Sequence, residues 1–229
     1  MKTVIIHGQS HAGSTCMVAR ELAQKVGWQT QEFFLPRDFD KPCLGCYTCF
    51  QQDLTHCPHY AQLEPLANAI LEADLIILES PVYVYHATGQ MMSFLDHFGT
   101  WWMIHRPRPE MSQKQAVSIA TAAGGGMKST VRDMADSLEM WGVHKVYKLG
   151  LGVQATKPEE IPAGIQKRIH KKTDVLARKI LVFHDGLCPE ALPTHGAGLR
   201  LLGADGLAPG RQTLEIGRSY ADGIYRCNS

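Results

Sequence analysis

The sequence predicts a doubly wound α/β fold built on a five-stranded parallel sheet. Short β-branched runs alternate with longer amphipathic segments, and five such pairs follow one another without an internal repeat or a second domain boundary. The strand order 2-1-3-4-5 is one of the two common forms of such a sheet. Ligands bind these folds in the crevice beyond the carboxyl ends of the strands, so we expect the functional site there.

Each strand is expected at a short apolar run, and each helix at the amphipathic segment that follows. The predicted strands are Thr3–His7, Thr30–Leu35, Asp74–Glu79, Ala116–Thr121 and His144–Leu149. The predicted helices are Thr15–Val26, Leu63–Glu72, Thr88–Phe98, Met127–Met140 and Pro158–Phe183. Gly27 follows the first helix, where a C-terminal glycine is typical.

Three segments depart from this repeat. Residues 36–62 form a cysteine-bearing excursion, residues 102–114 are expected to be a surface loop, and residues 185–229 are rich in glycine. The last segment is too short to build a core of its own. We therefore expect one domain over residues 1–183, with an insertion at 36–62, and an irregular C-terminal extension over 184–229.

The bulk composition excludes several classes of protein. The chain has 229 residues, 45% of them hydrophobic, and a net charge of +1. It shows no basic stripe for nucleic acid, and no apolar run reaches the roughly 18–20 residues that span a membrane. The apolar start of the chain is too short for a signal peptide. These features predict a cytoplasmic protein with neither a nucleic-acid nor a membrane partner.

The loop after the first strand is suited to an anion. Small and hydroxylated residues lead into the first helix, whose N-terminal amides and dipole favour phosphate. No Gly-Lys-Ser/Thr or Gly-x-Gly-x-x-Gly pattern is present, so a phosphomonoester such as that of FMN fits better than a triphosphate. The candidate phosphate residues are Ser10, His11, Ser14 and Thr15. A simpler role for Ser14, as a helix cap, remains open.

Two further loops follow the third and fourth strands at the same sheet edge. A flat ring system needs close backbone approach on one side, which the triple glycine permits, and an apolar or aromatic wall on the other. The candidate ring contacts are Pro81, Val82, Tyr83, Val84 and Tyr85 in one loop, and Thr121, Ala122, Gly124, Gly125 and Gly126 in the other. A flexible glycine turn, and tyrosines of the core or of an interface, are the simpler alternatives.

Together these segments resemble the NAD(P)H-dependent FMN reductase and iron–sulfur flavoprotein branch of the flavodoxin-like superfamily. The resemblance rests on the loop after the first strand, on Ser80-Pro81-Val82-Tyr83 with residues 89–96 (GQMMSFLD), and on the loop at 121–126. It covers roughly residues 1–183 and implies a flavodoxin-like fold with bound FMN. The family often has arginine or lysine where this chain has His11. The resemblance alone implies NAD(P)H as electron donor, and the sequence assigns no catalytic acid or base.

Four cysteines form a compact group with the spacing C-x2-C-x2-C-x7-C. They are Cys43, Cys46, Cys49 and Cys57, and such a group in a cytosolic chain binds metal or performs redox chemistry more often than it forms disulfides. Successive two-residue gaps favour an iron–sulfur cluster over the paired ligands of zinc sites. The resemblance also implies one [4Fe–4S] cluster. Thiols without metal, and zinc held by four thiolates or by three with His56 or His59, remain alternatives. Cys16, Cys188 and Cys227 are expected to be unligated.

The sequence therefore predicts an FMN-containing, electron-transferring oxidoreductase that uses NAD(P)H or a reduced protein donor. A cluster-free quinone or nitro-compound reductase and a non-catalytic flavodoxin-like carrier or sensor are the alternatives. The apolar run Trp101–Ile104, together with Tyr47 and Phe50, predicts an interface. The resemblance likewise implies a homo-oligomer, a dimer or tetramer.

Overall fold

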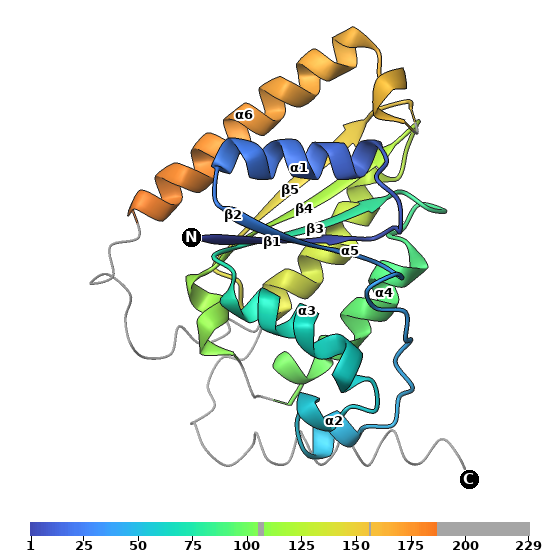
Figure 1. Ribbon diagram of the computed structural model, residues 1–229, viewed down its shortest axis with the longest axis vertical. Coiled ribbons are helices and arrows are strands. Elements are labelled where there is room, and N and C mark those ends of the chain that lie inside the picture. Colours follow the sequence, from blue (N-terminus) through green and yellow to red (C-terminus); the bar gives the residue numbers. More distant parts are fainter. Residues whose placement is uncertain (105–107, 156, 187–229) are drawn as a thin grey trace, which may run out of the picture. The chain divides into compact units, whose positions relative to one another are not determined.

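The computed structural model describes residues 1–104, 108–155 and 157–186. Its five strands form one parallel sheet in the order β2-β1-β3-β4-β5 (Figure 1). The strands are β1 (Lys2–His7), β2 (Gln29–Phe34), β3 (Leu75–Pro81), β4 (Gln115–Ala122) and β5 (Lys145–Gly152). The predicted flavodoxin-like fold and strand order are confirmed.

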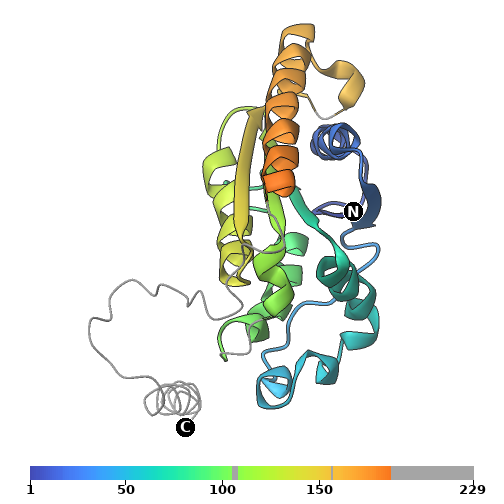
Figure 2. The ribbon, with the colours of Figure 1, turned by 90° about the vertical axis from the view of Figure 1, so that its left-hand side faces the viewer.

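Helices cover both faces of the sheet. On one face α1 (Ser14–Val26) lies beside α6 (Ala163–Gly186), as Figures 1 and 2 show. The other face carries α3 (Tyr60–Glu72), α4 (Gly89–Leu95) and α5 (Met127–Met140). Successive strand residues point to opposite faces of the sheet. Ile5 therefore packs in the core beneath α1 and α6, and Ile6 packs in the core beneath α3, α4 and α5. The alternation divides the buried side chains into two apolar layers.

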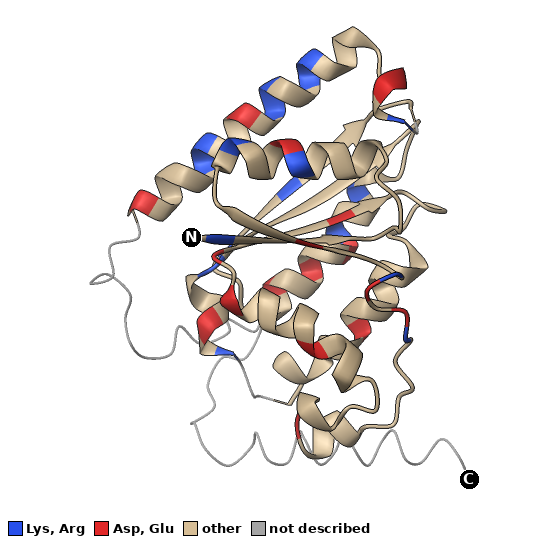
Figure 3. Ribbon diagram, viewed as in Figure 1, with Lys and Arg blue, Asp and Glu red and all other residues tan. Residues whose placement is uncertain are grey.

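Ionic contacts join α1 to α6 at the surface. Lys25 Nζ lies 2.8 Å from Glu21 Oε1 and 2.7 Å from Asp174 Oδ1, while Thr173 donates a hydrogen bond to Glu21. Figure 3 shows several basic residues spaced along α6. These contacts fix α6 against the carboxyl-terminal half of α1.

Four predicted helices have different bounds in the structure: α1 begins one residue earlier and α3 three residues earlier, and α4 and α6 differ more. The segment predicted as one helix, Thr88–Phe98, is α4 followed by the 3₁₀ helix η2 (Asp96–Trp101). The last helix starts at Ala163 rather than Pro158, after the 3₁₀ turn η4 (Pro158–Glu160). Pro162 has no amide hydrogen and therefore suits the position just before a helix rather than its interior.

The segments expected to be irregular contain short helices. Residues 36–62 include α2 (Thr48–Gln51) and the 3₁₀ helix η1 (Leu54–His56), and residues 109–113 form the 3₁₀ helix η3 (Pro109–Gln113). The expectation of a surface loop over 102–114 was wrong for its last part, because Met111 and Lys114 are buried. Lys114 Nζ donates hydrogen bonds to the backbone oxygens of Leu71 and Ala73, which secures the end of α3.

The expected interface run also needs correction. Trp101 is only 1% exposed and packs against Phe98 and Trp141, with ring centroids 4.5 and 5.2 Å away. Trp102 is 39% exposed and Met103 is 37% exposed. Trp101 is therefore a core residue, because the 3₁₀ turn of η2 directs its ring inward while its neighbours stay at the surface.

Most of the predicted C-terminal extension lies outside the described residues, which end at position 186. The boundary at 183/184 therefore stays a prediction; α6 itself continues to Gly186. Among the described residues, no helix is both long enough and apolar enough to cross a membrane.

Candidate functional site

A cavity of about 400 Å³ lies at the carboxyl edge of the sheet. Loops after β1, β3, β4 and β5 surround it, in agreement with the position that the strand order predicts. Eight of the fourteen predicted cofactor residues line it: His11, Ser14, Thr15, Pro81, Val82, Tyr83, Thr121 and Ala122. Its volume falls within the range of small-molecule sites.

The other six predicted residues lie outside this lining. Ser10 is exposed in the first loop, and Val84 and Tyr85 project from the second, with 90% and 68% of their surface exposed. The triple glycine at 124–126 also lies outside the lining and instead contacts the second loop.

The first turn of α1 faces the cavity without a capping side chain. Gly13 is the N-cap residue and provides no side-chain hydrogen bond, so the first amides of the helix remain available to an anion. Ser14 is not the cap, because it lies one residue inside the helix and its hydroxyl donates to the backbone oxygen of Ala155 at 2.9 Å. Thr15 Oγ1 lies 2.6 Å from Thr121 Oγ1. Backbone amides and His11 are thus the groups best placed for a phosphate.

The loop after β3 forms a tight hairpin with a strained backbone. Tyr83 and His86 exchange two backbone hydrogen bonds of 2.9 and 3.0 Å. Between them Val84 and Tyr85 have φ angles of 50° and 67°. Such angles are unusual for a β-branched residue, and outliers of this kind concentrate at functional sites. The hairpin is held in place by Ser129 of α5, whose hydroxyl donates to the Tyr85 backbone oxygen.

The triple glycine packs directly against this hairpin. A Cβ atom added to Gly126, whose φ is +86°, would lie 2.6 Å from Val82 Cγ1 and 3.1 Å from Tyr85 Cα. A Cβ at Gly125 would meet the Tyr85 ring at an ordinary 3.5 Å, and one at Gly124 would meet nothing within 4 Å. Close approach of the two loops therefore requires glycine at position 126.

Sequence reasoning missed six lining residues: Gln9, Gly13, Ala123, Gln154, Ala155 and Glu160. Three of them follow β5, and Gln154 has a left-handed φ of 58°. The rule that ligands bind at the carboxyl ends of strands applies to β5 as it does to β3 and β4, so it could have identified this loop.

The four grouped cysteines lie on the segment that follows β2. Cys43 and Cys46 are exposed, and Cys49 and Cys57 are half-buried. Gly45, between the first two, has a φ of +63°. Among the described residues, no group of three or more histidine, cysteine, aspartate or glutamate side chains is arranged to hold a metal ion.

The thiols nevertheless influence one another. Burial first, and then the thiolates of Cys57, Cys43 and Cys46, raise the pKa of Cys49 to about 11. Burial also raises the pKa of Cys57. The four sulfur atoms therefore lie close enough to interact, and a cation placed among them would relieve the repulsion between thiolates. This chemistry fits a soft metal or an iron–sulfur cluster.

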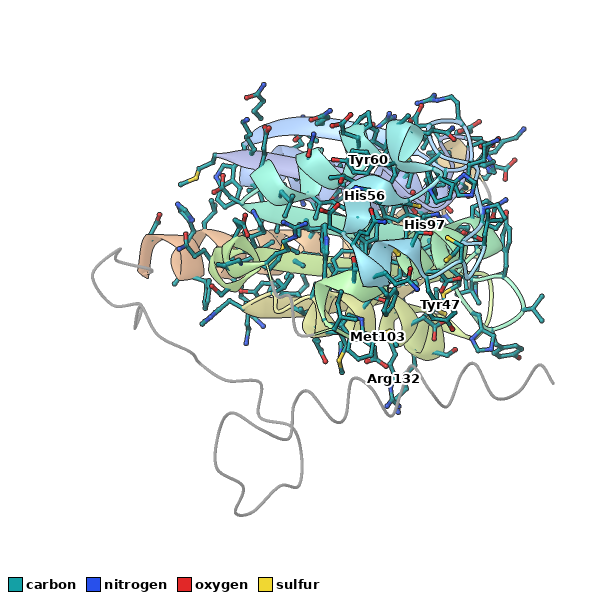
Figure 4. All side chains as sticks on the ribbon, turned by 90° about the horizontal axis from the view of Figure 1, so that it is seen from below. Tyr47, His56, Tyr60, His97, Met103 and Arg132 are labelled. Atoms are coloured by element: carbon teal, nitrogen blue, oxygen red, sulfur yellow. The ribbon has the colours of Figure 1, made fainter. Side chains whose placement is uncertain are left out.

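Two aromatic side chains of the cysteine-bearing segment, Tyr47 and Phe50, pack against each other, and Phe50 also packs against η2. Phe50 contacts Gly99, where an added Cβ would lie 3.2 Å from the Phe50 ring and 3.3 Å from the Met103 sulfur. The rings of Tyr47 and Phe50 are 5.7 Å apart. Figure 4 labels Tyr47, Met103 and His97 in this part of the molecule.

Curated relatives with similar sequences are iron–sulfur flavoproteins of archaea. The chain is 28% identical over 186 residues to an iron–sulfur flavoprotein of Archaeoglobus fulgidus, which covers 79% of each chain. It is 25% identical over 149 residues to an iron–sulfur flavoprotein of Methanosarcina thermophila, covering 62% of this chain and 75% of the relative.

Solved structures with the same fold include two reductases. A flavone reductase superposes with a TM-score of 0.59 at 17% identity, covering 80% of this chain and 64% of its own length. An azoreductase of Bacillus anthracis superposes with a TM-score of 0.60 at 11% identity, covering 78% and 99%. At these identities the similarity establishes the fold alone.

The model of one protein family matches residues 1–154, a range that contains the whole sheet and three of the four loops around the cavity, together with the start of the fourth. This match covers well over half of the chain. The chain belongs to the NADPH-dependent FMN reductase family, an enzyme family whose members bind FMN.

Proposed function

We propose that this FMN-dependent oxidoreductase is an iron–sulfur flavoprotein. The observation that carries the proposal is the group of four cysteines with the spacing C-x2-C-x2-C-x7-C on the segment after β2. The similarity to archaeal proteins named iron–sulfur flavoproteins supports it. Cys43, Cys46, Cys49 and Cys57 would hold one [4Fe–4S] cluster, which supplies one-electron transfer when bound.

FMN would occupy the cavity at the sheet edge and supply the redox chemistry when bound. The first-turn amides of α1, with His11, would hold its phosphate, and Ser14 and Thr15 would line the cavity beside it. The loops at 81–85 and 121–126 would enclose the ring, and the hairpin with its strained backbone would limit the access of water. Electrons would come from NAD(P)H or a reduced protein donor.

The decisive experiment is a metal and cofactor analysis of anaerobically purified protein. We expect about one FMN, about four iron atoms and about four acid-labile sulfides per chain, as one [4Fe–4S] cluster requires. Serine at any of the four cysteines should lower iron, while Cys188→Ser and Cys227→Ser serve as matched controls that leave it unchanged. Stoichiometric zinc without sulfide would contradict the cluster.

A cluster-free NAD(P)H-dependent quinone or nitro-compound reductase is the second candidate. The exposure of Cys43 and Cys46 favours it, since exposed thiols are free to remain unligated. FMN without iron, combined with rapid anaerobic NAD(P)H oxidation by a quinone, would establish this candidate. FMN without any NAD(P)H oxidation would instead indicate a carrier.

We also propose that the chain forms a homo-oligomer, a dimer or tetramer. Large apolar side chains are exposed at the hairpin and at the cysteine-bearing segment, including Val84, Tyr85 and Leu44. Trp102 and Met103 add to this apolar surface. A second copy of the chain would remove these groups from water.

A further inference from the structure

A fully buried ionic pair lies at the ends of β1 and β3. His7 and Glu79 are register partners in the sheet, and both are 0% exposed. His7 Nδ1 lies 2.7 Å from Glu79 Oε1, and the imidazole stacks on Phe34 at 4.1 Å between ring centroids. Isolated buried charges are costly, so each of these two groups depends on the other as its partner.

The pair lies directly beneath the cavity. Side chains two residues apart in a strand share a face, so Glu79 points to the same face as Pro81, which lines the cavity. Because a strand rises about 3.3 Å per residue, the Cα atoms of Glu79 and Pro81 lie about 7 Å apart. Gly8, which follows His7, begins the phosphate loop, and its amide donates to the Glu79 backbone oxygen at 2.7 Å.

A second ion pair connects this buried pair to the surface. His7 Nε2 lies 3.4 Å from Glu32 Oε2, and Arg20 of α1 forms a bidentate contact with Glu32 at 3.0 and 2.7 Å. The Glu32 side chain is partly exposed. His7 therefore lies between the buried Glu79 carboxyl and a partly exposed carboxylate.

One oxygen of the buried carboxyl has no hydrogen bond. Glu79 Oε2 is enclosed and unpartnered among the described residues. Burial raises the pKa of Glu79, although its contact with His7 opposes the shift. Burial lowers the pKa of His7, but the Cys16 thiol and the Glu79 carboxylate outweigh it and raise that pKa to about 9. The pair thus holds one proton firmly and has a site for a second.

Other charged groups around the pair do not compete for that second proton. Burial raises the pKa of Glu32, but Arg20 outweighs it and keeps this carboxyl ionised. The remaining groups that interact with the pair are Cys16 and Arg20 on α1, Asp38 with its partner Arg37 after β2, and His11 in the loop after β1.

We propose that the His7–Glu79 pair is the proton-binding counter-charge of the cavity and takes up one proton from solvent when a phosphate dianion binds above it. The phosphate loop contains no arginine or lysine, so this buried proton supplies positive charge that the loop lacks. A negative charge in the cavity beside the pair stabilises its protonated form, and by linkage protonation strengthens binding of the anion. The inference rests on the proposed FMN site.

Calorimetric titration with FMN at pH 8, in two buffers of different ionisation enthalpy, measures the proton uptake. At this pH a phosphomonoester is already a dianion and contributes no proton of its own. We expect net proton uptake when FMN binds, and an FMN affinity that falls as the pH rises from 7 to 9. Riboflavin lacks the phosphate and should bind without uptake.

Glu79→Gln keeps the size of the side chain and an acceptor for His7, yet it cannot take up a proton. We expect this variant to bind FMN with little proton uptake and with a flattened pH profile. Glu21→Gln is the matched control, because Glu21 lies 2.8 Å from His170 Nδ1 in a second His–Glu pair, one whose histidine is exposed. It should behave like the wild type.

Equal proton uptake by wild type and Glu79→Gln, with FMN bound to both, would overturn this inference and leave the proposed function intact. Failure of the wild type to bind FMN would overturn both. If Glu79→Gln does not fold, the wild type alone provides a test. Proton uptake that is equal for FMN and riboflavin would refute the proposal.

Discussion

Thr15 and Thr121 join the first helix to the fourth strand through their hydroxyl groups, whose oxygens lie 2.6 Å apart. Both residues are buried, and both line the cavity at the sheet edge. Since one hydroxyl donates and the other accepts, each satisfies the other's polar group away from water. The contact therefore fixes the first turn of α1 relative to the loop after β4, two of the segments that form the proposed FMN site.

We predict that breaking this contact on one side is costlier than removing it altogether. Thr121→Val leaves the Thr15 hydroxyl buried without a partner, so the free energy of unfolding should fall by about 1–3 kcal/mol. The double variant Thr15→Val/Thr121→Val should lose less than the sum of the two single variants. Urea unfolding of all four proteins gives this coupling, and strictly additive losses would show that the two hydroxyls act independently.

Adjacent glycines of the triple-glycine loop should differ sharply in tolerance. In Gly126→Ala the new methyl group would lie 2.6 Å from Val82 Cγ1 at a φ of +86°, so the hairpin must move. We expect FMN affinity to fall at least about tenfold, a loss of about 1.4 kcal/mol. Gly125→Ala, which meets only the Tyr85 ring at 3.5 Å, is the matched control. Fluorescence titration with FMN compares them, and equal affinities would place the ring elsewhere.

The strained hairpin should yield a stabilising substitution. Val84 has a φ of 50° and is 90% exposed, so its side chain contributes little packing to offset the strain. Asparagine adopts left-handed angles more readily, and Val84→Asn should raise the free energy of unfolding by about 1 kcal/mol. Thermal unfolding in the absence of FMN measures the change. A lower melting temperature would mean that Val84 packs against something, such as a second copy of the chain.

Substitutions of the neighbouring residues Trp101 and Trp102 should have different effects, the first on folding and the second on assembly. Trp101→Glu places a charge in the aromatic core beside Phe98 and Trp141, so this variant should fail to fold at ordinary temperature. Trp102→Glu changes a half-exposed side chain and should fold normally while weakening the proposed oligomer. Sedimentation at micromolar concentration distinguishes these outcomes. A wild-type protein that sediments as a monomer would refute the oligomer.

Acid should weaken the junction of α1 with α6. Burial raises the pKa of Glu21, but hydrogen bonds from Lys25, Thr173 and His170 outweigh it and lower the pKa overall. A carboxyl with a lowered pKa stabilises the fold above its unfolded pKa of about 4.3 and loses this effect as pH falls through the folded value. Glu21→Gln should therefore cost about 0.5–1 kcal/mol at pH 7, a figure kept small by solvent screening, and almost nothing near pH 3. Urea unfolding at both pH values checks this; an equal loss at both would mean that charge plays no part.

Much of the fold was predictable because its signals are local. Apolar runs at the inner strands, alternating with amphipathic segments, specify a parallel sheet with two covered faces, since a strand buried on both faces must be apolar on both sides. The ends of the helices were harder to predict where a turn determines them. For example, α6 begins at Ala163, directly after Pro162, rather than at Pro158. The general position of the site was also predictable, because parallel strands end at one edge of the sheet.

Residue-level roles depended on contacts between distant parts of the chain. Hydroxylated residues at a helix start favour phosphate binding, yet Ser14 donates to Ala155, 141 positions away, and Thr15 pairs with Thr121. Trp101 and Trp102 look alike in the sequence, and only the turn of η2 buries the first and exposes the second.

The sequence by itself determined the strands, their order and the edge at which a ligand would bind, because hydrophobic periodicity records which faces are buried. Only the tertiary structure decided which polar groups meet. His7 and Glu79 each stand in an apolar strand, 72 positions apart, and nothing local to either predicts the other. Sheet pairing brings them into register, and burial then raises the pKa of Glu79 and leaves the pair able to bind a proton.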